Sequence, residues 1–492
     1  MRKVFEPQMT FGQTPIDQIK IDMRARDEIP KLLLGLQHIF CHKTLRQKVF
    51  EILETIVPED VNSKNGRPGM DLWKILVMGT VRLNCNWDYD KLQEIVNNHK
   101  TIRQMLGHGL MDDDDMYALQ TLKDNVQLLT PEILDEINTL VVKEGHKLLG
   151  KKKDQALMGK CDSFVVETDV HYPTDINLLF DAIRKTIQSA AVICQSLGMS
   201  MWRQSEYNIR TFKKLFRQAQ RLKHSTSKDE QKKTKRAQLI VETHRLYIKA
   251  AEQFIQKANL TIETIGSSNP IGVAQIKELI EYIDHAILQV DLIQRRVIQG
   301  EKIPHAEKVF SIFEPHTEWI SKGKAGVPQE LGPHLRVCIV EDKYGLILHH
   351  QVMEKETDDK VTVPIINAAQ NKFNNLRGCS FDKGFYSPAN KKELKGMLDI
   401  LVLPKKGKRN KTELEEETAD VFIQHRKKHS AVESAINGLE NHGLDRCPDS
   451  GILGFKRYVS LSILARNLQI IGHHIQQKEL KKLQRTERRK AS

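Results

Sequence analysis

The first 150 residues carry apolar positions at the three-to-four-residue spacing of amphipathic helices. The segment MDLWKILVMGTVRLNCNW is one such stretch, and DYDKLQEIVNNHKTIRQMLGHG is the next. Asp88 or Asp90 is placed to cap the second helix, and Gly107 is placed to end it. Two helices joined by a short turn suit a DNA-binding module, although a plain helical bundle fits the same pattern. We therefore expect a helical domain over residues 1–150.

The pattern changes at CDSFVVETDV, where β-branched and apolar residues predict a strand. Successive side chains of a strand point to opposite faces. Asp162 therefore shares a face with Phe164 and Val166, whereas Glu167 and Asp169 share the other face. Carboxylates in such a run are costly unless they are paired or bind a metal ion, so the acids of this strand are candidates for function.

Beyond the strand, apolar spacing predicts long amphipathic helices, with a polar and basic turn at 223–236 that would join two of them as a hairpin. Short β-type runs return as KVFSIF, LRVCIV and GLILHHQVM, and strands and helices then alternate. This order predicts an α/β protein whose catalytic core is interrupted by a helical insertion. The expected parts are a helical N-terminal DNA-binding domain (1–150), a linker (151–154), a first strand segment of the core (155–174), the helical insertion (175–302), the remainder of the core (303–475) and a basic C-terminal tail (476–492) that is frayed or binds phosphate.

The net positive charge of the chain indicates the class of its partner. The 492 residues carry a formal net charge of +13 and a pI of about 9.2, which favours a polyanionic partner, either nucleic acid or an anionic membrane surface. A basic protein with a solvated, lysine-rich surface fits the same charge. No apolar run has the length of a transmembrane helix, the N-terminus is not a signal peptide, and the seven cysteines form no CxxC pair. We therefore expect a cytoplasmic protein with reduced thiols and no membrane partner.

Three acids stand out by their surroundings. Asp162 opens the strand, Asp382 follows the apolar residues of SFDKGFYS at a glycine turn, and Glu433 lies in HSAVESAINGLE beside the apolar face of a helix. Ligands at strand ends converge naturally in open α/β sheets. Carboxylates from distant segments are what two magnesium ions need for an in-line phosphoryl displacement. Each acid alone is more often a cap, a turn residue or a solvated side chain, and only the three together favour a metal site.

The same segments resemble a bacterial insertion-sequence transposase of the DDE class, near the ISNCY group. The resemblance rests on CDSFVVETDVHYPTDINLLFDAI, WISKGKAGVPQELG, SFDKGFYS and HSAVESAINGLENHGLDRC, and on the N-terminal GRPGMDLWKILVMGTVRLNCNWDYDKLQEIVNNHKTIRQMLG. It spans roughly residues 65 to 475, with the motifs in the order of the family.

The resemblance implies an RNase H-like catalytic core interrupted by the long helical insertion. It assigns Asp162, Asp382 and Glu433 as catalytic ligands of two Mg²⁺ or Mn²⁺ ions. The implied reaction cuts DNA at the ends of an insertion sequence and joins the 3′-hydroxyl to target DNA. The implied partners are double-stranded DNA, as terminal inverted repeats and target, and a second copy of the chain in a homodimer.

Other residues are candidates for contacts to DNA phosphates. They are Lys322 and Lys324, which flank a predicted glycine turn in SKGKAG, Lys383, which follows the second acid, and His429, which lies one turn before the third acid. A solvated hairpin loop is the alternative for the first two lysines, and a structural role is the alternative for His429. Trp202 and Trp319 are candidates for stacking on an exposed base, although a lone tryptophan is more often part of a core.

Some points of the resemblance stay open. The family's Y-x2-R-x3-E-x6-K helix pattern is not kept, since Arg426, His429 and Glu440 stand at its tyrosine, arginine and lysine positions. Asp169, with Glu167 beside it, is a rival first ligand. A non-catalytic, domesticated DNA-binding protein and a metal-dependent nuclease without strand transfer are the alternative functions.

Overall fold

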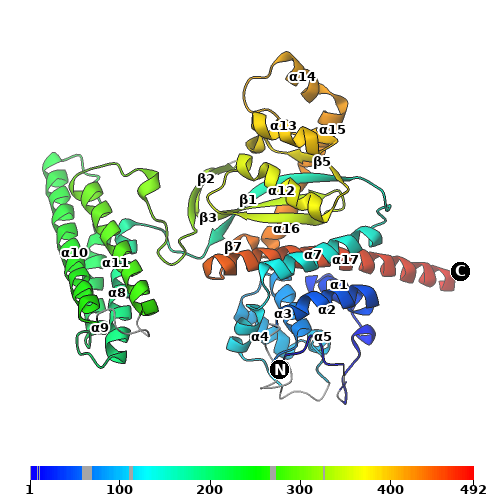
Figure 1. Cartoon of the computed structure of the whole chain (residues 1–492), viewed down its shortest axis with the longest axis horizontal. Coiled ribbons are helices and arrows are strands. Elements are labelled where there is room, and N and C mark those ends of the chain that lie inside the picture. The colour runs from blue at the N-terminus through cyan, green and yellow to red at the C-terminus, as the bar shows by residue number, and fades with distance from the viewer. Residues whose placement is uncertain are drawn as a thin grey trace. The chain divides into compact units, whose positions relative to one another are not determined.

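The structure is a computed structural model that describes residues 2–7, 9, 11–57, 69–109, 115–265, 273–324 and 327–491. Side chains are described over the same residues except 273–274, 321–333 and 490–491. The chain divides into two compact units (Figure 1). The first unit is made of Met1–Asp169 and His334–Ser492, and the second is Val170–Pro333.

Helices make up most of the first unit, and α4 begins at a cap that the sequence predicts. Asp88 caps α4, because its carboxylate accepts a hydrogen bond from the Lys91 amide at 2.7 Å. Gly107 adopts a left-handed conformation, with φ of 78°, shortly after α5 ends. The helices of this unit are α1 (Glu28–Cys41), α2 (Lys43–Glu54), α3 (Leu72–Asn84), α4 (Tyr89–Asn98), α5 (Lys100–Met105), α6 (Leu119–Val126), α7 (Pro131–Leu148), α12 (Asp358–Lys372), α13 (Pro388–Met397), α14 (Lys411–Thr418), α15 (Asp420–His429), α16 (Ala431–Leu439) and α17 (Gly451–Ala491).

The long helix α17 passes between the sheet and the N-terminal helices (Figure 1). It crosses α1 with the two backbones in contact. A Cβ atom at Gly472 would lie 1.6 Å from the carbonyl oxygen of Lys31, and one at Gly35 would lie 2.4 Å from the carbonyl oxygen of Leu468. Only glycine fits at this crossing. The prediction of a frayed tail is wrong, because residues 476–491 continue α17 as helix.

Seven strands of the described chain form one mixed sheet, so the fold is α/β as predicted. The strand order is β2-β3-β1-β5-β6, with β4 paired to β3 and β7 paired to β1. β3 is antiparallel to β1 and to β4, whereas β5 runs parallel to β1 and β6 parallel to β5. The strands are β1 (Leu157–Thr168), β2 (Glu318–Lys324), β3 (Val327–Asp342), β4 (Ile347–Met353), β5 (Leu376–Phe381), β6 (Ile400–Val402) and β7 (Arg446–Cys447).

One predicted strand is absent from this sheet. The run KVFSIF at residues 308–313 forms no strand. Its Ile312 instead packs into the core of the helical second unit. A short apolar run was therefore read as a strand although its burial comes from helix packing.

The two faces of the sheet are buried in different cores. Phe164 and Val166 of β1 belong to the core formed by the N-terminal helices, α16 and α17. Cys161 belongs to the core on the opposite face, which α12 covers. Because side chains alternate along a strand, Asp162 lies on the face of Phe164 and Val166, as the sequence predicts.

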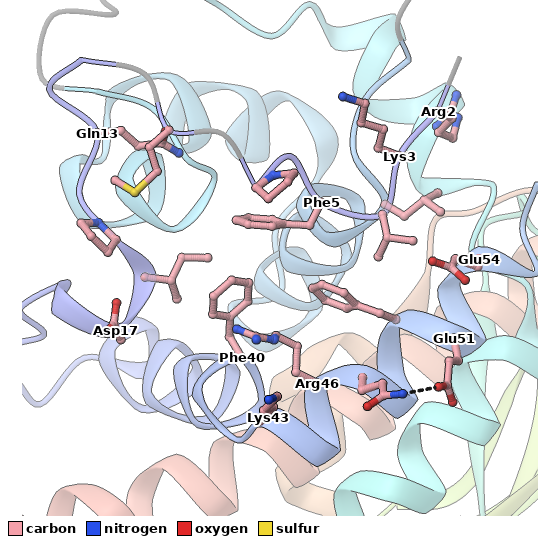
Figure 2. A pocket seen from close by; sticks show the side chains of 18 of the residues that line it. Arg2, Lys3, Phe5, Gln13, Asp17, Phe40, Lys43, Arg46, Glu51 and Glu54 are labelled. Carbon is pink, nitrogen blue, oxygen red and sulfur yellow. Dashed lines mark hydrogen bonds between the residues drawn. The ribbon is translucent and has the colours of Figure 1, made fainter. Parts of the chain in front are cut away.

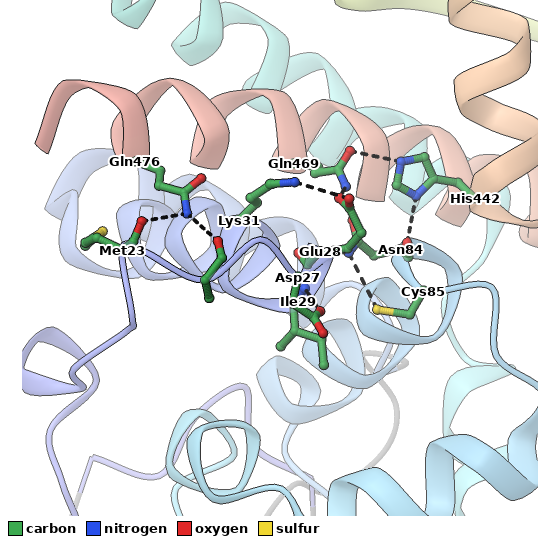
Figure 3. A network of polar contacts seen from close by, with 11 residues as sticks. Met23, Asp27, Glu28, Ile29, Lys31, Asn84, Cys85, His442, Gln469 and Gln476 are labelled. Carbon is green, nitrogen blue, oxygen red and sulfur yellow. Dashed lines mark hydrogen bonds and ion pairs between the residues drawn. The ribbon is translucent and has the colours of Figure 1, made fainter. Parts of the chain in front are cut away.

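A polar network joins the segment after α16 to α1, α3 and α17 (Figure 3). His442 lies in the one-turn helix η6 (Glu440–Leu444), where its Nδ1 donates to the Asn84 carbonyl oxygen at 2.9 Å and its Nε2 lies 3.0 Å from Gln469 Oε1. The Gln469 amide in turn donates to the Glu28 carboxylate. Burial of the imidazole lowers the pKa of His442. These contacts fix the C-terminal end of α16 in the fold.

The second unit consists mainly of long helices around a core of its own. Trp202 is buried in this core and its indole Nε1 donates to Thr261 Oγ1 at 2.9 Å, so it is not an exposed stacking platform. Within the described ranges, none of the chain's helices combines the length and the apolar composition that crossing a bilayer requires. The helices of this unit are α8 (Asp175–Ser196), α9 (Ser205–Arg221), α10 (Glu230–Ile265) and α11 (Val273–Ile293).

Candidate active site

Asp162 lies in the middle of β1, and Asp382 directly follows the last residue of the parallel strand β5. In the pairing of β1 with β5, Lys160 lies opposite Ser380 and Cys161 opposite Phe381. The next residue of each segment is an aspartate, and the backbone of Asp382 is still extended. Cys161 and Phe381 both lie in the core on the α12 side, so both aspartates lie on the other face. The register thus aligns two carboxylates on strands that are about 4.8 Å apart.

The turn after Asp382 packs closely against the start of α12. Ser163, the neighbour of Asp162, donates from its hydroxyl to the Asp358 carboxylate at 2.7 Å. A Cβ atom at Gly384 would lie 2.8 Å from the other carboxylate oxygen of Asp358. The Asp358 carboxylate thus lies between Ser163 of β1 and the glycine of the DKGF motif, and a side chain at that glycine would require Asp358 to shift.

Glu433 lies on the short helix α16, which packs on β1. Val432 and Leu439 of this helix are buried in the same core as Phe164. The helix therefore covers the face of the sheet that carries Asp162, while Glu433 itself is exposed. The third predicted ligand thus belongs to an element on the same face as the other two.

His429 connects the sheet to this helix. Its Nδ1 and the Ser380 hydroxyl form a hydrogen bond of 3.0 Å, and Ser380 precedes Asp382 by two residues on the same face. Burial lowers the pKa of His429, the carboxylates of Asp382 and Glu433 raise it, and Lys160 lowers it, with a net decrease. Its Nε2 is buried and has no hydrogen-bond partner in the described part of the chain. His429 is therefore within electrostatic range of two of the three acids and has a ring nitrogen left to bind a ligand.

Two neighbours of the acids were not predicted from the sequence. Lys160 lies on the same face of β1 as Asp162 and forms an ion pair of 2.6 Å with the buried carboxylate of Glu341. Ser380 is fully buried beside His429. Both stand two positions before an aspartate, so the alternation of a strand, counted back from each acid, would have found them.

The rival ligand Asp169 lies elsewhere. It is exposed, follows the end of β1, and forms an ion pair with Arg446. Asp169 lies seven positions after Asp162, which corresponds to about 23 Å along a strand, so Asp169 does not share the register of Asp382. The geometry favours Asp162 as the partner of Asp382.

Of the three candidate phosphate-binding lysines, the structure describes the side chain of one, Lys383. Lys383 is exposed and forms no ion pair with any described residue. Lys322 and Lys324 lie in β2, and their side chains are outside the residues whose side chains the structure describes. The glycine between them is part of the strand, so the predicted turn at that position is wrong.

One observation speaks against metal binding by these residues, and others favour it. Among the described residues, no group of three or more His, Cys, Asp or Glu side chains is arranged to hold a metal ion. The donor chemistry nevertheless suits Mg²⁺ or Mn²⁺, because the register aligns two carboxylates and Glu433 lies on a helix that covers the same face. The unpartnered Nε2 of His429 is a further sign that this face binds a ligand.

A large cavity lies away from these residues, beside α1 and α2 (Figure 2). Its volume is 1160 Å³, and aromatic rings of Phe5, Phe40 and Phe50 line it. The guanidinium of Arg46 lies over the Phe40 ring, 5.0 Å from its centroid. None of the predicted site residues lines this cavity, so its size gives no support for the carboxylate site.

Comparisons with known protein families, with curated proteins and with solved structures found no match for this chain. A function for the protein therefore rests on its own residues and their geometry.

Proposed function

We propose that the protein is a DDE-type DNA transposase with an RNase H-like catalytic core, which cuts DNA at the ends of an insertion sequence and joins the 3′-hydroxyl to target DNA. The parallel register that aligns Asp162 with Asp382 carries the proposal. Glu433 adds support because α16 packs on the same face. The strand order supports an RNase H-like core: β3 is antiparallel to β1 on one side and pairs in turn with the antiparallel β4, while β5 and β6 run parallel to β1 on the other side.

The three acids would hold two Mg²⁺ or Mn²⁺ ions, which when bound neutralise charge on the attacking and leaving oxygens of an in-line displacement. In the cutting step a water oxygen bonds to phosphorus, the bond from phosphorus to the 3′-oxygen breaks, and that oxygen takes a proton. In the joining step the new 3′-hydroxyl loses its proton and its oxygen bonds to a phosphorus of target DNA, while the target's own 3′-oxygen leaves. Asp162, Asp382 and Glu433 serve both steps.

The neighbours of the acids would position the DNA backbone. His429 has an unpartnered Nε2 next to the acids, and a phosphate oxygen or an ordered water suits this nitrogen. Lys383 is exposed directly after Asp382, where its ammonium reaches phosphates close to the scissile bond. Lys322 and Lys324 stay candidates for the same kind of contact.

The helical unit supports DNA as the partner through the basic face of α9. Its apolar residues Phe212 and Ala219 are buried, so the opposite side of the helix faces solvent. Within the described part of the chain the cations of that side form no ion pair, which leaves their charge available to phosphates. These exposed cations are Arg210, Lys213, Lys214, Arg217 and Arg221.

The proposed reaction also implies the assembly and the place of the protein. Two ends of one element have to be joined, so a homodimer on two terminal inverted repeats is expected. The substrate and the free thiols of all seven cysteines suit a protein of the cytoplasm.

One experiment separates this function from its two alternatives. The purified protein is incubated with labelled terminal-repeat DNA, a target plasmid and Mg²⁺. Nicking at the repeat end together with joined product supports a transposase, nicking without joining supports a plain nuclease, and binding without nicking supports a non-catalytic DNA-binding protein. The Asp162→Asn variant should bind DNA as the wild type does and produce neither product. The proposal fails if this variant keeps wild-type cutting.

A further inference from the structure

A second strongly charged feature lies in the first unit, at the amino ends of the parallel strands. It is a pocket of 670 Å³ lined by residues of α2, α7, α12, the start of β5 and the segment 151–154 before β1. Segments more than 300 residues apart in sequence meet there, from Lys48 to Arg377. The segment interpreted from sequence as a linker is thus one wall of a pocket.

The residues that line this pocket carry a large excess of positive charge. Eight are lysine or arginine and two are acidic. Lys147 is paired with Glu144 at 2.8 Å and Lys372 with Asp135 at 2.5 Å. The other six form no ion pair with described residues, and Asp154 is the one remaining acid of the lining, which leaves a surplus of five positive charges. These six are Lys48, Lys143, Lys151, Lys152, Lys153 and Arg377.

Such a concentration of like charge raises the free energy of the folded protein unless an anion offsets it. A small phosphorylated ligand is usually held by backbone N–H groups of a glycine-rich loop or a helix N-terminus. None of the residues that line this pocket is glycine. The N-terminus of α2 contributes to the lining, but its Leu45 amide already donates to the side chain of the capping His42. The flexible lysines act as point charges without a fixed ligand geometry. Duplex DNA presents one negative charge per about 1.7 Å of its axis, so several of its phosphates can neutralise five cations at once.

We propose that this pocket binds the phosphate backbone of double-stranded DNA, as a second DNA contact distinct from the carboxylate site. The inference rests on the proposed function in taking DNA as the partner. Ala156 lines the pocket, and Asp162 lies six residues further along β1, which corresponds to about 20 Å. DNA held at the pocket therefore has its bound phosphates well away from the acids, and the contact is independent of sequence because only backbone charge is read.

The test compares two triple variants by the salt dependence of DNA affinity. One variant carries Lys151→Gln, Lys152→Gln and Lys153→Gln. The matched control carries three lysine-to-glutamine changes at exposed positions that do not line the pocket. The Kd for a random-sequence duplex is measured without Mg²⁺ at several salt concentrations, and thermal unfolding confirms that both variants are folded. The control positions are Lys20, Lys392 and Lys478.

Each lysine that contacts a phosphate contributes about 0.9 to the slope of log Kd against log salt. The pocket variant should therefore lose about two to three units of slope, and the control should keep the wild-type slope. Equal slopes for wild type and pocket variant would overturn the inference. It would also be overturned if inorganic triphosphate bound tightly to the wild type, displaced no DNA, and lost its binding in the pocket variant.

The outcomes separate this inference from the proposed function. A reduced slope in a protein that never cuts DNA would support the second contact and reject the transposase. An unchanged slope in a protein that cuts and joins DNA would reject the second contact alone. Absence of any DNA binding by the wild type would reject both.

Discussion

The two ends of the parallel pair β1 and β5 share one backbone frame and carry opposite charges. At their amino ends, lysines from several segments line a pocket with a surplus of positive charge. Further along, the same register aligns Asp162 with Asp382 below a helix that carries Glu433. Because the two strands are parallel, their amino ends lie side by side, and so do the residues further along each strand. The lysines before β1 and β5 are therefore kept apart from the two aspartates.

The difference between the two ends lies in how their charges are held. The lysines of the 151–153 segment are largely exposed, and their segment precedes the sheet. The acids sit on or beside the sheet, with Ser380, His429 and Asp358 fixing the turn and helix around them. Long, solvated cations suit a contact that tolerates any DNA sequence, whereas chemistry needs groups held in place.

The largest expected effect is at the acidic end. If the proposed two-metal site is correct, Asp162→Asn and Asp382→Asn should each lower the cutting rate about 10³-fold or more, because each removes a charge that the ions would need. The double variant should lose no more than either single variant, since the two residues act as one unit. Single-turnover cutting of labelled DNA measures this.

The matched control for these variants is Asp169→Asn, which changes an exposed aspartate of the same segment that pairs with Arg446. It should retain cutting close to that of the wild type. If Asp169→Asn lost cutting while Asp162→Asn kept it, the catalytic acid would lie at the carboxyl end of β1. The contrast between the basic pocket and an acidic site at Asp162 would then not hold.

The next largest effect should be on the stability of the whole first unit, and therefore on both DNA binding and cutting. Gly472→Ala places a methyl group 1.6 Å from the Lys31 carbonyl oxygen, where α17 and α1 cross. Overpacking of this kind costs about 1–3 kcal/mol or more of unfolding free energy. Urea unfolding should show the loss, and DNA binding and cutting should fall in parallel above the midpoint temperature of the variant.

Gly396→Ala is the control for this packing effect. Gly396 lies in α13, and nothing lies within 4 Å of the position that its Cβ atom would take. Alanine is the better helix former, so the variant should be as stable as the wild type or slightly more stable. Equal destabilisation by both variants would mean that the crossing of α1 and α17 is not tight.

A smaller effect is expected at His429, which lies beside the acids. His429→Ala should slow cutting about tenfold, because a tenfold change in rate corresponds to the free energy of roughly one hydrogen bond. The affinity for DNA should change little. Single-turnover rates at saturating DNA separate the two quantities. His429→Arg, which restores the residue of the family pattern, should recover part of the rate. Unchanged cutting by His429→Ala would assign the side chain a role in packing alone.

The smallest effect concerns pH. Burial lowers the pKa of His442 in the folded chain, whereas in the unfolded chain a histidine takes a proton near pH 6.5. The stability contributed by this neutral histidine is therefore present above pH 6.5 and is lost as the pH falls through that value, by at most about 1.4 kcal/mol per pH unit. His442→Gln should flatten the decline of unfolding free energy between pH 7 and pH 5.

The comparison variant for this measurement is Lys152→Gln, at the basic end. It should keep the wild-type dependence of unfolding free energy on pH, because it changes an exposed side chain away from His442. A steeper decline in His442→Gln than in the wild type would contradict the sign of the shift.

Sequence reasoning succeeded where local spacing carries the information. The spacing predicts Asp88 or Asp90 as a cap, and the structure selects Asp88; the alternation predicts that Asp162 shares the face of Phe164 and Val166, and the structure confirms it. The same reasoning failed at KVFSIF, because a short apolar run has the same pattern whether a strand or a helical core buries it. That the predicted linker 151–154 also lines a pocket could not be predicted, because the other walls of that pocket are distant in sequence.

By itself the sequence determined the helices, the alternation along β1 and the three acids, because these follow from the spacing of neighbouring residues. Only the tertiary structure decided that Cys161 pairs with Phe381, so that the next residues, Asp162 and Asp382, lie on neighbouring segments and Asp169 lies outside this register. Only the tertiary structure brought Lys48 and Arg377 to the 151–153 segment. Strand register and pocket walls depend on packing between segments hundreds of residues apart, and no local pattern encodes such distances.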